Sequence, residues 1–148
     1  MNPTGASFGW STNAGDLCLA GAAAMVLQAP VALSMSYEEH QHFSGKRCPC
    51  HSNGRLACDK DGKIIAAEFE FGLDHGAYSW GGDDCMTKQP RFAFFPYNIP
   101  NVAGLARVAN TNHNFGTAYR SYGSPQAYNL SEPLMDMLAE EAGIEPFE

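Results

Sequence analysis

The sequence has 148 residues, which is the size of one average domain. Its 45% hydrophobic and 17% charged residues lie near the averages of globular proteins, so composition excludes disordered, collagen-like and low-complexity chains. The formal net charge is -7. Because an acidic chain is repelled by a phosphate backbone, we expect no nucleic-acid partner.

Three features bear on localisation. The longest apolar stretch, 17–27, is about half of the ~20 residues needed to cross a bilayer, so we expect no membrane span. A secretory signal starts with basic residues, whereas the first basic residue here is Lys46. The cysteine count is odd, at five, and the spacing is irregular, which favours reduced thiols. We therefore expect a cytoplasmic protein.

The N-terminal part predicts one clear helix. Small polar residues at 11–13 can cap a helix over 17–27, and Pro30 stops it. Because this stretch is apolar on all sides, we expect it to be buried on several sides. Residues 31–37 then alternate as a strand would, and 38–43 form a short polar connector of about one helical turn.

The middle of the chain predicts a β-hairpin. Residues 63–74 alternate between apolar and polar side chains, as a half-buried strand does. The turn-forming residues at 59–62 precede it, so 50–58 is expected to be the other arm. Residues 102–109 indicate a further strand.

The remaining segments complete the fold class. Gly81, Gly82 and Pro90 interrupt a segment without a clear pattern. Beyond Ser124 and Pro125, apolar residues recur at helical spacing, with Pro133 inside the helical stretch. Helices mixed with largely antiparallel hairpins predict an α+β architecture.

One group of residues looks like a metal cluster: Cys48, Cys50, His51 and Cys58. Common zinc knuckles place two to four residues between paired cysteines, so this spacing favours structural thiols over a zinc site, and we predict no metal ligand. Elsewhere, His75 and His113 are expected to be hydrogen-bonded structural histidines. No serine or cysteine lies in a nucleophile-elbow pattern, so hydrolase chemistry has no support.

The most unusual segment is 117–126, TAYRSYGSPQ. It places Arg120 between two aromatic residues, just before a helix start. A fixed cation beside backbone donors suits an anionic or oxygen-bearing ligand. The alternative is an arginine stacked on tyrosines as packing, and local chemistry leaves both interpretations open.

At this segment the chain resembles the molybdenum-binding catalytic subunit of the xanthine oxidase family, the molybdenum hydroxylases. Residues 118–126, AYRSYGSPQ, match the family pattern A-[FY]-R-G-[FY]-G-x-P-Q, with Ser121 in place of a glycine. Further pieces resemble the family in order at 5–9, 43–47, 59–66, 73–79, 97–112 and 134–148. The resemblance implies that 1–148 is a partial molybdenum cofactor-binding domain of the aldehyde oxidase and xanthine dehydrogenase type.

The resemblance also implies roles for individual residues. The expected cofactor contacts are Phe8, Gly9, Ala118, Tyr119 and Arg120. The expected substrate-pocket residues are Tyr122, Thr12, Gly81 and Asp84. The general-base glutamate of the family lies in a region after this chain's last residue, so we expect no catalytic residue within the chain.

The reaction implied by the resemblance is the hydroxylation of an aldehyde to a carboxylic acid, with water as the oxygen source. The expected cofactor is molybdenum–molybdopterin cytosine dinucleotide, with iron–sulfur clusters on a partner domain or subunit and a flavin subunit as an optional addition. The chain alone is expected to be inactive without the remaining molybdenum-domain segments. Two alternatives are a purine-like substrate and a truncated relic domain with a structural or zinc-binding role.

Overall fold

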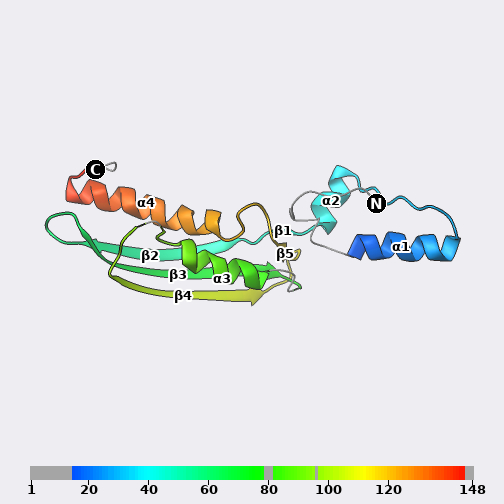
Figure 1. The fold of residues 1–148 in the computed structure, drawn as a ribbon, viewed down its shortest axis with the longest axis horizontal. Helices are drawn as coiled ribbons and strands as arrows, with labels where there is room; N and C mark the ends of the chain where they lie inside the picture. The colour runs from blue at the N-terminus through cyan, green and yellow to red at the C-terminus, as the bar shows by residue number, and fades with distance from the viewer. Residues whose placement is uncertain (1–14, 79–81, 96, 146–148) are drawn as a thin grey trace.

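The computed structural model describes residues 15–78, 82–95 and 97–145, without the side chains of residues 82 and 83. Four helices and five strands follow one another along these residues (Figure 1). Their order is α1 (Gly15–Leu27), α2 (Tyr37–Phe43), β1 (Lys46–Arg47), β2 (Cys50–Cys58), β3 (Ile64–Gly76), α3 (Gly82–Phe92), β4 (Asn101–Asn110), β5 (Gly116–Thr117) and α4 (Ser124–Ala142). The α+β architecture is therefore confirmed.

The strands form two sheets. The larger sheet has the order β2-β3-β4, and β1 pairs with β5 in a second, two-stranded sheet. The predicted hairpin is present, since β2 and β3 pair antiparallel. The other two pairings, β3 with β4 and β1 with β5, are parallel. Among the described residues, antiparallel pairing is thus limited to the hairpin. The β3–β4 pair is parallel because the chain crosses over through α3 before it reaches β4.

The hairpin turn is held by Asp59. Its Oδ1 accepts hydrogen bonds from the backbone N–H groups of Asp61 and Lys63, at 2.9 and 3.0 Å. Gly62 takes a φ of 81°, which favours glycine at this position of the turn. The predicted turn at 59–62 therefore sets the register of β2 against β3.

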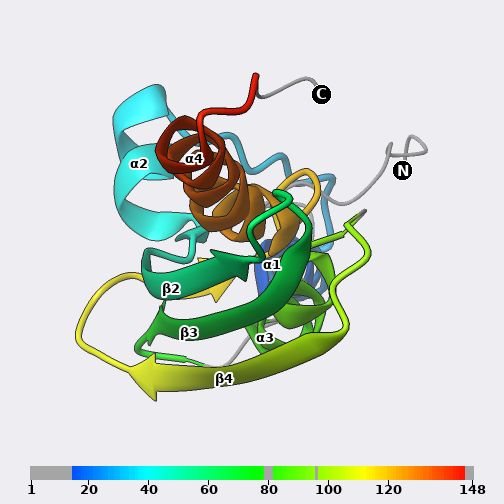
Figure 2. The ribbon, with the colours of Figure 1, turned by 90° about the vertical axis from the view of Figure 1, so that its left-hand side faces the viewer.

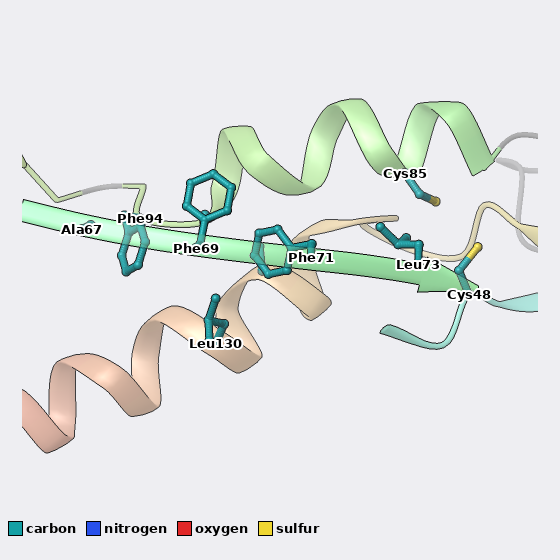
Figure 3. Close-up of a cluster of buried hydrophobic side chains, with 10 residues drawn as sticks. Cys48, Ala67, Phe69, Phe71, Leu73, Cys85, Phe94 and Leu130 are labelled. Atoms are coloured by element: carbon teal, nitrogen blue, oxygen red, sulfur yellow. The ribbon is translucent and has the colours of Figure 1, made fainter. Parts of the chain in front are cut away.

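The core lies on one face of the larger sheet (Figure 3). Phe69, Phe71 and Leu73 alternate along β3 and are buried against α3 and α4. α4 lies over the β2 side of this face and α3 over the β4 side (Figure 2). The opposite face carries exposed ion pairs, Arg55 with Glu68 and Arg107 with Glu70, as expected of a half-buried sheet.

Helix α1 confirms the predicted element but not its predicted surroundings. It ends at Leu27, before Gln28 with a φ of 50° and ahead of Pro30. No residue of α1 is buried, and Leu19, for example, is 62% exposed. The helix lies away from the larger sheet (Figure 1). The expectation that this helix is buried on several sides is therefore wrong for this chain.

The predicted strand at 31–37 is also wrong. Residues 30–36 have no regular structure, and Tyr37 begins α2. Ser36 accepts a hydrogen bond from the backbone of Glu39, and the Glu39 carboxylate accepts one from the backbone N–H of Ser36. This capping box starts the helix.

Helix α3 occupies the segment that showed no clear pattern. It begins at Gly82 and continues through Pro90 to Phe92. Its buried residues Cys85 and Gln89 are four positions apart and so face the core together. Among the helices of the described ranges, none is long and apolar enough to cross a bilayer.

Candidate functional site

The two-stranded sheet brings distant parts of the chain together beside one end of the larger sheet (Figure 1). Lys46 pairs with Gly116, and Arg47 pairs with Thr117. A side chain at Gly116 would overlap the Cys48 sulfur, so glycine permits this close approach. The pairing places β1 beside the start of the unusual segment that comes after β5.

That segment turns sharply between β5 and α4. Ser121 has a φ of 56° and Gly123 a φ of 88°, both in the left-handed region. The backbone N–H of Ser124 donates to the Ser121 carbonyl at 2.9 Å. The family pattern has a glycine at the position of Ser121. The left-handed φ gives a physical reason for that glycine, because glycine adopts this conformation without steric cost.

Arg47 holds the segment from one side. Its Nη2 donates to the backbone carbonyl of Arg120 at 3.1 Å, and its guanidinium lies 5.7 Å from the centre of the Tyr119 ring. In return, the Tyr119 hydroxyl donates to the Gly45 carbonyl at 3.0 Å. These contacts fix the backbone that carries Arg120 against β1.

Lys88 of α3 holds the segment from another side. Its Nζ donates to the Tyr122 hydroxyl at 2.7 Å and lies 4.1 Å from the centre of the Tyr122 ring. Lys88 and Tyr122 are both half-buried. The tyrosine ring is thereby fixed in orientation relative to α3.

The Arg120 side chain itself is exposed. The ion pairs among the described residues are Arg55–Glu68, Arg107–Glu70 and His113–Asp74, and none of them includes Arg120. The cations that lie on the flanking tyrosines are Arg47 and Lys88. Arg47 and Lys88, rather than Arg120, are therefore the cations that pack on these two tyrosines.

The other predicted site residues divide into two groups. Ala118 and Tyr119 are half-buried beside Arg120, and Asp84 is exposed in the first turn of α3, one turn before Lys88. Phe8, Gly9, Thr12 and Gly81 lie outside the described residues. Ala118, Tyr119, Arg120 and Tyr122 are neighbours in the sequence, and the structure adds α3, which lies beside them through the contact of Lys88 with Tyr122.

The five cysteines are free thiols. Cys48 and Cys85 are buried and their sulfurs point toward each other (Figure 3). A hydrogen bond from Cys85 lowers the pKa of Cys48, and the same bond together with burial raises the pKa of Cys85. Among the described residues, no group of three His, Cys, Asp or Glu side chains could hold a metal ion.

The two histidines differ from each other. His113 is exposed and its Nδ1 lies 2.5 Å from Oδ2 of Asp74. His75 is buried, yet neither of its ring nitrogens has a hydrogen-bond partner among the described residues. Both histidines were predicted to be hydrogen-bonded and structural. His113 has a partner but is exposed, so the prediction holds for it only in part. His75 is buried but lacks the predicted hydrogen bond among the described residues, so that part of the prediction is wrong.

Sequence reasoning missed Arg47 and Lys88. Arg47 lies 73 positions from Arg120, and Lys88 lies 34 positions from Tyr122, so neither contact follows from local spacing. One feature of the sequence could have indicated them. Tyrosine rings attract cations, so the two tyrosines that flank Arg120 suggest lysine or arginine partners from elsewhere in the chain.

The described residues fit an anionic, oxygen-rich group such as a metal–pterin cofactor. Arg120 offers an exposed guanidinium, which is permanently charged and donates hydrogen bonds in a planar fork. Nearby, Nη1 of Arg47 is buried without a hydrogen-bond partner among the described residues, which adds positive charge behind the segment. The donor set is therefore suited to oxygen acceptors.

Comparisons with known proteins point the same way. A curated aldehyde oxidoreductase from Megalodesulfovibrio gigas is 43% identical over 147 residues, covering 99% of this chain and 16% of that protein. The large molybdopterin subunit of nicotinate dehydrogenase from Eubacterium barkeri is 31% identical, with 98% of this chain and 34% of that subunit covered. The crystal structure of the aldehyde oxidoreductase from Desulfovibrio desulfuricans matches with a TM-score of 0.90 and 40% identity, over 97% of this chain and 16% of that one.

These matches cover almost all of this chain but only a small part of each relative. A family model described as the molybdopterin cofactor-binding domain matches residues 1–148. The fold, the Arg120 segment and the matches agree, and the chain belongs to the molybdopterin cofactor-binding domain family of the molybdenum hydroxylases.

Proposed function

We propose that this chain is part of the catalytic subunit of an aldehyde oxidoreductase that converts aldehydes to carboxylic acids with water as the oxygen source. The identity to an aldehyde oxidoreductase, 43%, exceeds the identity to a nicotinate dehydrogenase subunit, 31%, which supports an aldehyde over a heterocycle. The proposed domain is a partial molybdenum cofactor-binding domain that spans residues 1–148.

The observation that carries the proposal is the presentation of Arg120. Its side chain is exposed while Arg47 holds its backbone carbonyl. Such an arrangement fixes the backbone from which a permanent positive charge extends, and none of the ion pairs of the described residues neutralises that charge. It suits a charged, oxygen-rich cofactor that must be held rigidly during a reaction.

Each residue of the segment has a proposed role toward molybdenum–molybdopterin cytosine dinucleotide. Arg120 donates to oxygen atoms of the group, and the backbones of Ala118 and Tyr119 line the same side. Phe8 and Gly9 are proposed to approach from another side. When bound, the cofactor supplies the two-electron oxidation and the hydroxylation of the substrate.

Tyr122 is proposed to form a wall of the substrate pocket. Its ring is fixed by Lys88 at the hydroxyl, so it can orient a planar carbonyl compound. The same pocket is proposed to include Thr12, Gly81 and Asp84. The substrate would therefore lie between the start of α3 and the segment that carries Arg120.

Other segments are proposed to complete the catalytic unit. The chain spans 16% of the length of the aldehyde oxidoreductase that it matches. Helix α1 supports this, because exposed leucine, methionine and valine side chains on one helix indicate a surface that another segment covers. We propose that the general base lies on such a segment and that an iron–sulfur or flavin partner takes the electrons. The chain alone would then be inactive.

The test uses the complete protein that contains this sequence. Arg120→Lys keeps the charge but loses the planar fork, so molybdenum content or rate should fall by roughly ten- to a hundredfold, the worth of one charged hydrogen bond of about 1.5–3 kcal/mol. Tyr122→Ala should retain molybdenum and change the preference between a small and a bulky aldehyde.

Arg55→Lys is the matched control, since Arg55 is exposed on the opposite face of the sheet and pairs there with Glu68. This control should keep both molybdenum and rate. If Arg120→Lys kept full molybdenum and full rate, the assignment of Arg120 to the cofactor would be wrong.

A further inference from the structure

A hollow lies between α3, the turn before α4 and the first turns of α4. It has a volume of about 370 Å³, within the range of small-molecule sites of about 300–1,000 Å³. Its lining residues are Lys88, Phe92, Ser121, Tyr122, Ser124 and Tyr128. The hollow is therefore built from aromatic rings and hydroxyl groups around one cation.

Three aromatic side chains line the hollow, and two of them are in contact. The rings of Phe92 and Tyr128 lie 6.4 Å apart, between centres, and are tilted by 58°. Phe92, Tyr122 and Tyr128 are each half-buried, so part of each ring remains accessible. A planar ring can pack on such a surface by stacking or by edge contacts.

Lys88 supplies the charge of the hollow. One of its N–H groups is used by the Tyr122 hydroxyl at 2.7 Å, which leaves further donors on the ammonium group. No carboxylate is among the lining residues, and Lys88 is in none of the ion pairs of the described residues. Asp84 lies one turn away on α3 and is exposed. The cation is therefore available to an anion inside the hollow.

We propose that this hollow selects planar aromatic substrates that carry a carboxylate, and that Lys88 is the residue that determines this specificity. The inference rests on the proposed function, because it makes Tyr122 and Lys88 part of the substrate pocket beside Arg120. The ammonium group pairs with the carboxylate while the aromatic side chains contact the ring. A single cation between aromatic walls suits a singly charged aromatic acid better than a polyanion.

The first test measures binding and needs no turnover. Benzoate and the neutral benzamide are titrated calorimetrically into the complete protein and its Lys88→Met variant, whose side chain has similar length and no charge. We expect Lys88→Met to weaken benzoate binding about tenfold more than benzamide binding, because loss of the Tyr122 contact affects both probes and loss of the charge affects benzoate alone. Lys88→Arg should retain the preference for benzoate, and Lys60→Met, in the exposed hairpin turn, should change neither affinity.

The second test measures turnover with para-formylbenzoate and the neutral para-tolualdehyde. We expect Lys88→Met to lower kcat/KM for para-formylbenzoate, through KM, about tenfold more than for para-tolualdehyde, because loss of the Tyr122 hydrogen bond affects both aldehydes and loss of the charge affects only the carboxylate. Tyr122→Phe removes the hydroxyl that occupies Lys88, so the preference for the carboxylate should persist or increase.

The outcomes separate the two proposals. If the complete protein oxidises neither aldehyde, the proposed function fails, while benzoate binding that depends on Lys88 still supports the charged hollow. If the wild type does not bind benzoate, or if Lys88→Met changes both members of each pair equally, the specificity role of Lys88 is overturned. Should Lys88→Met fail to fold, a loss of the carboxylate preference in Lys88→Arg would also contradict the proposal.

Discussion

Helix α1 and strand β3 are both rich in apolar residues, yet their surroundings are opposite. Phe71 of β3 is fully buried between α3 and α4, whereas Val26 of α1 is 82% exposed. The sequence of α1 is apolar on all sides, and that of β3 is apolar on one side only. The difference teaches that the described part of the chain supplies the partners that bury β3, but none that bury α1.

This difference separates two sources of stability. The sheet with α3 and α4 forms a hydrophobic core from residues of this chain alone. Burial of α1 would instead contribute only where another surface covers it, at about 25 cal/mol for each Å² of apolar area. Substitutions in the two regions should therefore respond differently to the presence of the rest of the protein.

The largest effect is expected in the core. In the 148-residue chain, Phe71→Ala should lower the free energy of unfolding by about 3–5 kcal/mol, because it removes a buried ring and leaves a cavity. Leu19→Ala in α1 should change it by no more than about 0.5 kcal/mol, because Leu19 is already exposed. Urea denaturation of both variants measures the difference. A similar loss in both would contradict the distinction between the two regions.

A smaller effect is expected at the end of β3, where Asp74 ties β3 to the loop after β4. Its Oδ1 accepts from the Thr111 hydroxyl at 2.5 Å and from the Gly76 N–H at 2.9 Å. These bonds, led by Thr111 and aided by His113, lower the pKa of Asp74 below its ordinary value. The resulting stabilisation is fully present above the ordinary pKa of an aspartate in the unfolded chain. It is lost as pH falls from that pKa to the lower pKa of Asp74 in the folded chain.

Thr111→Val should remove part of this pH dependence. At neutral pH we expect the free energy of unfolding of the variant to be about 1 kcal/mol below that of the wild type. As pH falls from about 5 to about 3, the free energy of unfolding should decrease less in the variant than in the wild type. Thermal unfolding across that range measures both quantities. Parallel curves for the two proteins would show that the Thr111 bond does not stabilise the ionised Asp74.

A last effect, of similar size, is expected at Ser121, in the segment that carries Arg120. Its φ of 56° is strained for a side chain, so Ser121→Gly should be more stable than Ser121→Ala by about 1 kcal/mol. At an ordinary helical position the order would be reversed. Denaturation of the two variants gives the sign, and a more stable alanine variant would contradict the left-handed conformation.

Much of the central fold could be predicted from local patterns. The alternation around Phe69 and Phe71 indicated β3, and the residues at 59–62 indicated the hairpin turn. The direction of β4 could not be predicted. Alternating apolar and polar side chains indicate which face of a strand is buried, but not whether its partner strand runs parallel or antiparallel. The parallel pairing follows from the crossover through α3.

The missed elements have identifiable physical causes. Helix α3 buries Cys85 and Gln89, and a buried glutamine does not register in a hydrophobic pattern. Residues 31–36 alternate in polarity, but the capping box of Ser36 and Glu39 was the stronger signal, and it favours a helix from Tyr37 onward. The uncovered state of α1 could not be predicted, because an apolar helix does not reveal whether its partners lie within the same sequence.

The sequence predicted which segment forms the candidate site, but not the three-dimensional contacts that hold this segment. The motif around Arg120 identified the segment from its residues alone. Its supports, Arg47 and Lys88, come from distant positions, so only the folded chain brings them to Tyr119 and Tyr122. The sequence could therefore indicate the segment of the candidate site, but not which distant residues hold that segment in place.

The central claim is that this chain helps to hold a molybdenum–pterin cofactor. The most direct measurement is metal analysis, together with mass spectrometry of the released pterin, on the complete protein purified with its natural partners. We predict equimolar molybdenum and a cytosine dinucleotide form of the pterin. Protein that is folded, complete and free of both molybdenum and pterin would contradict the claim.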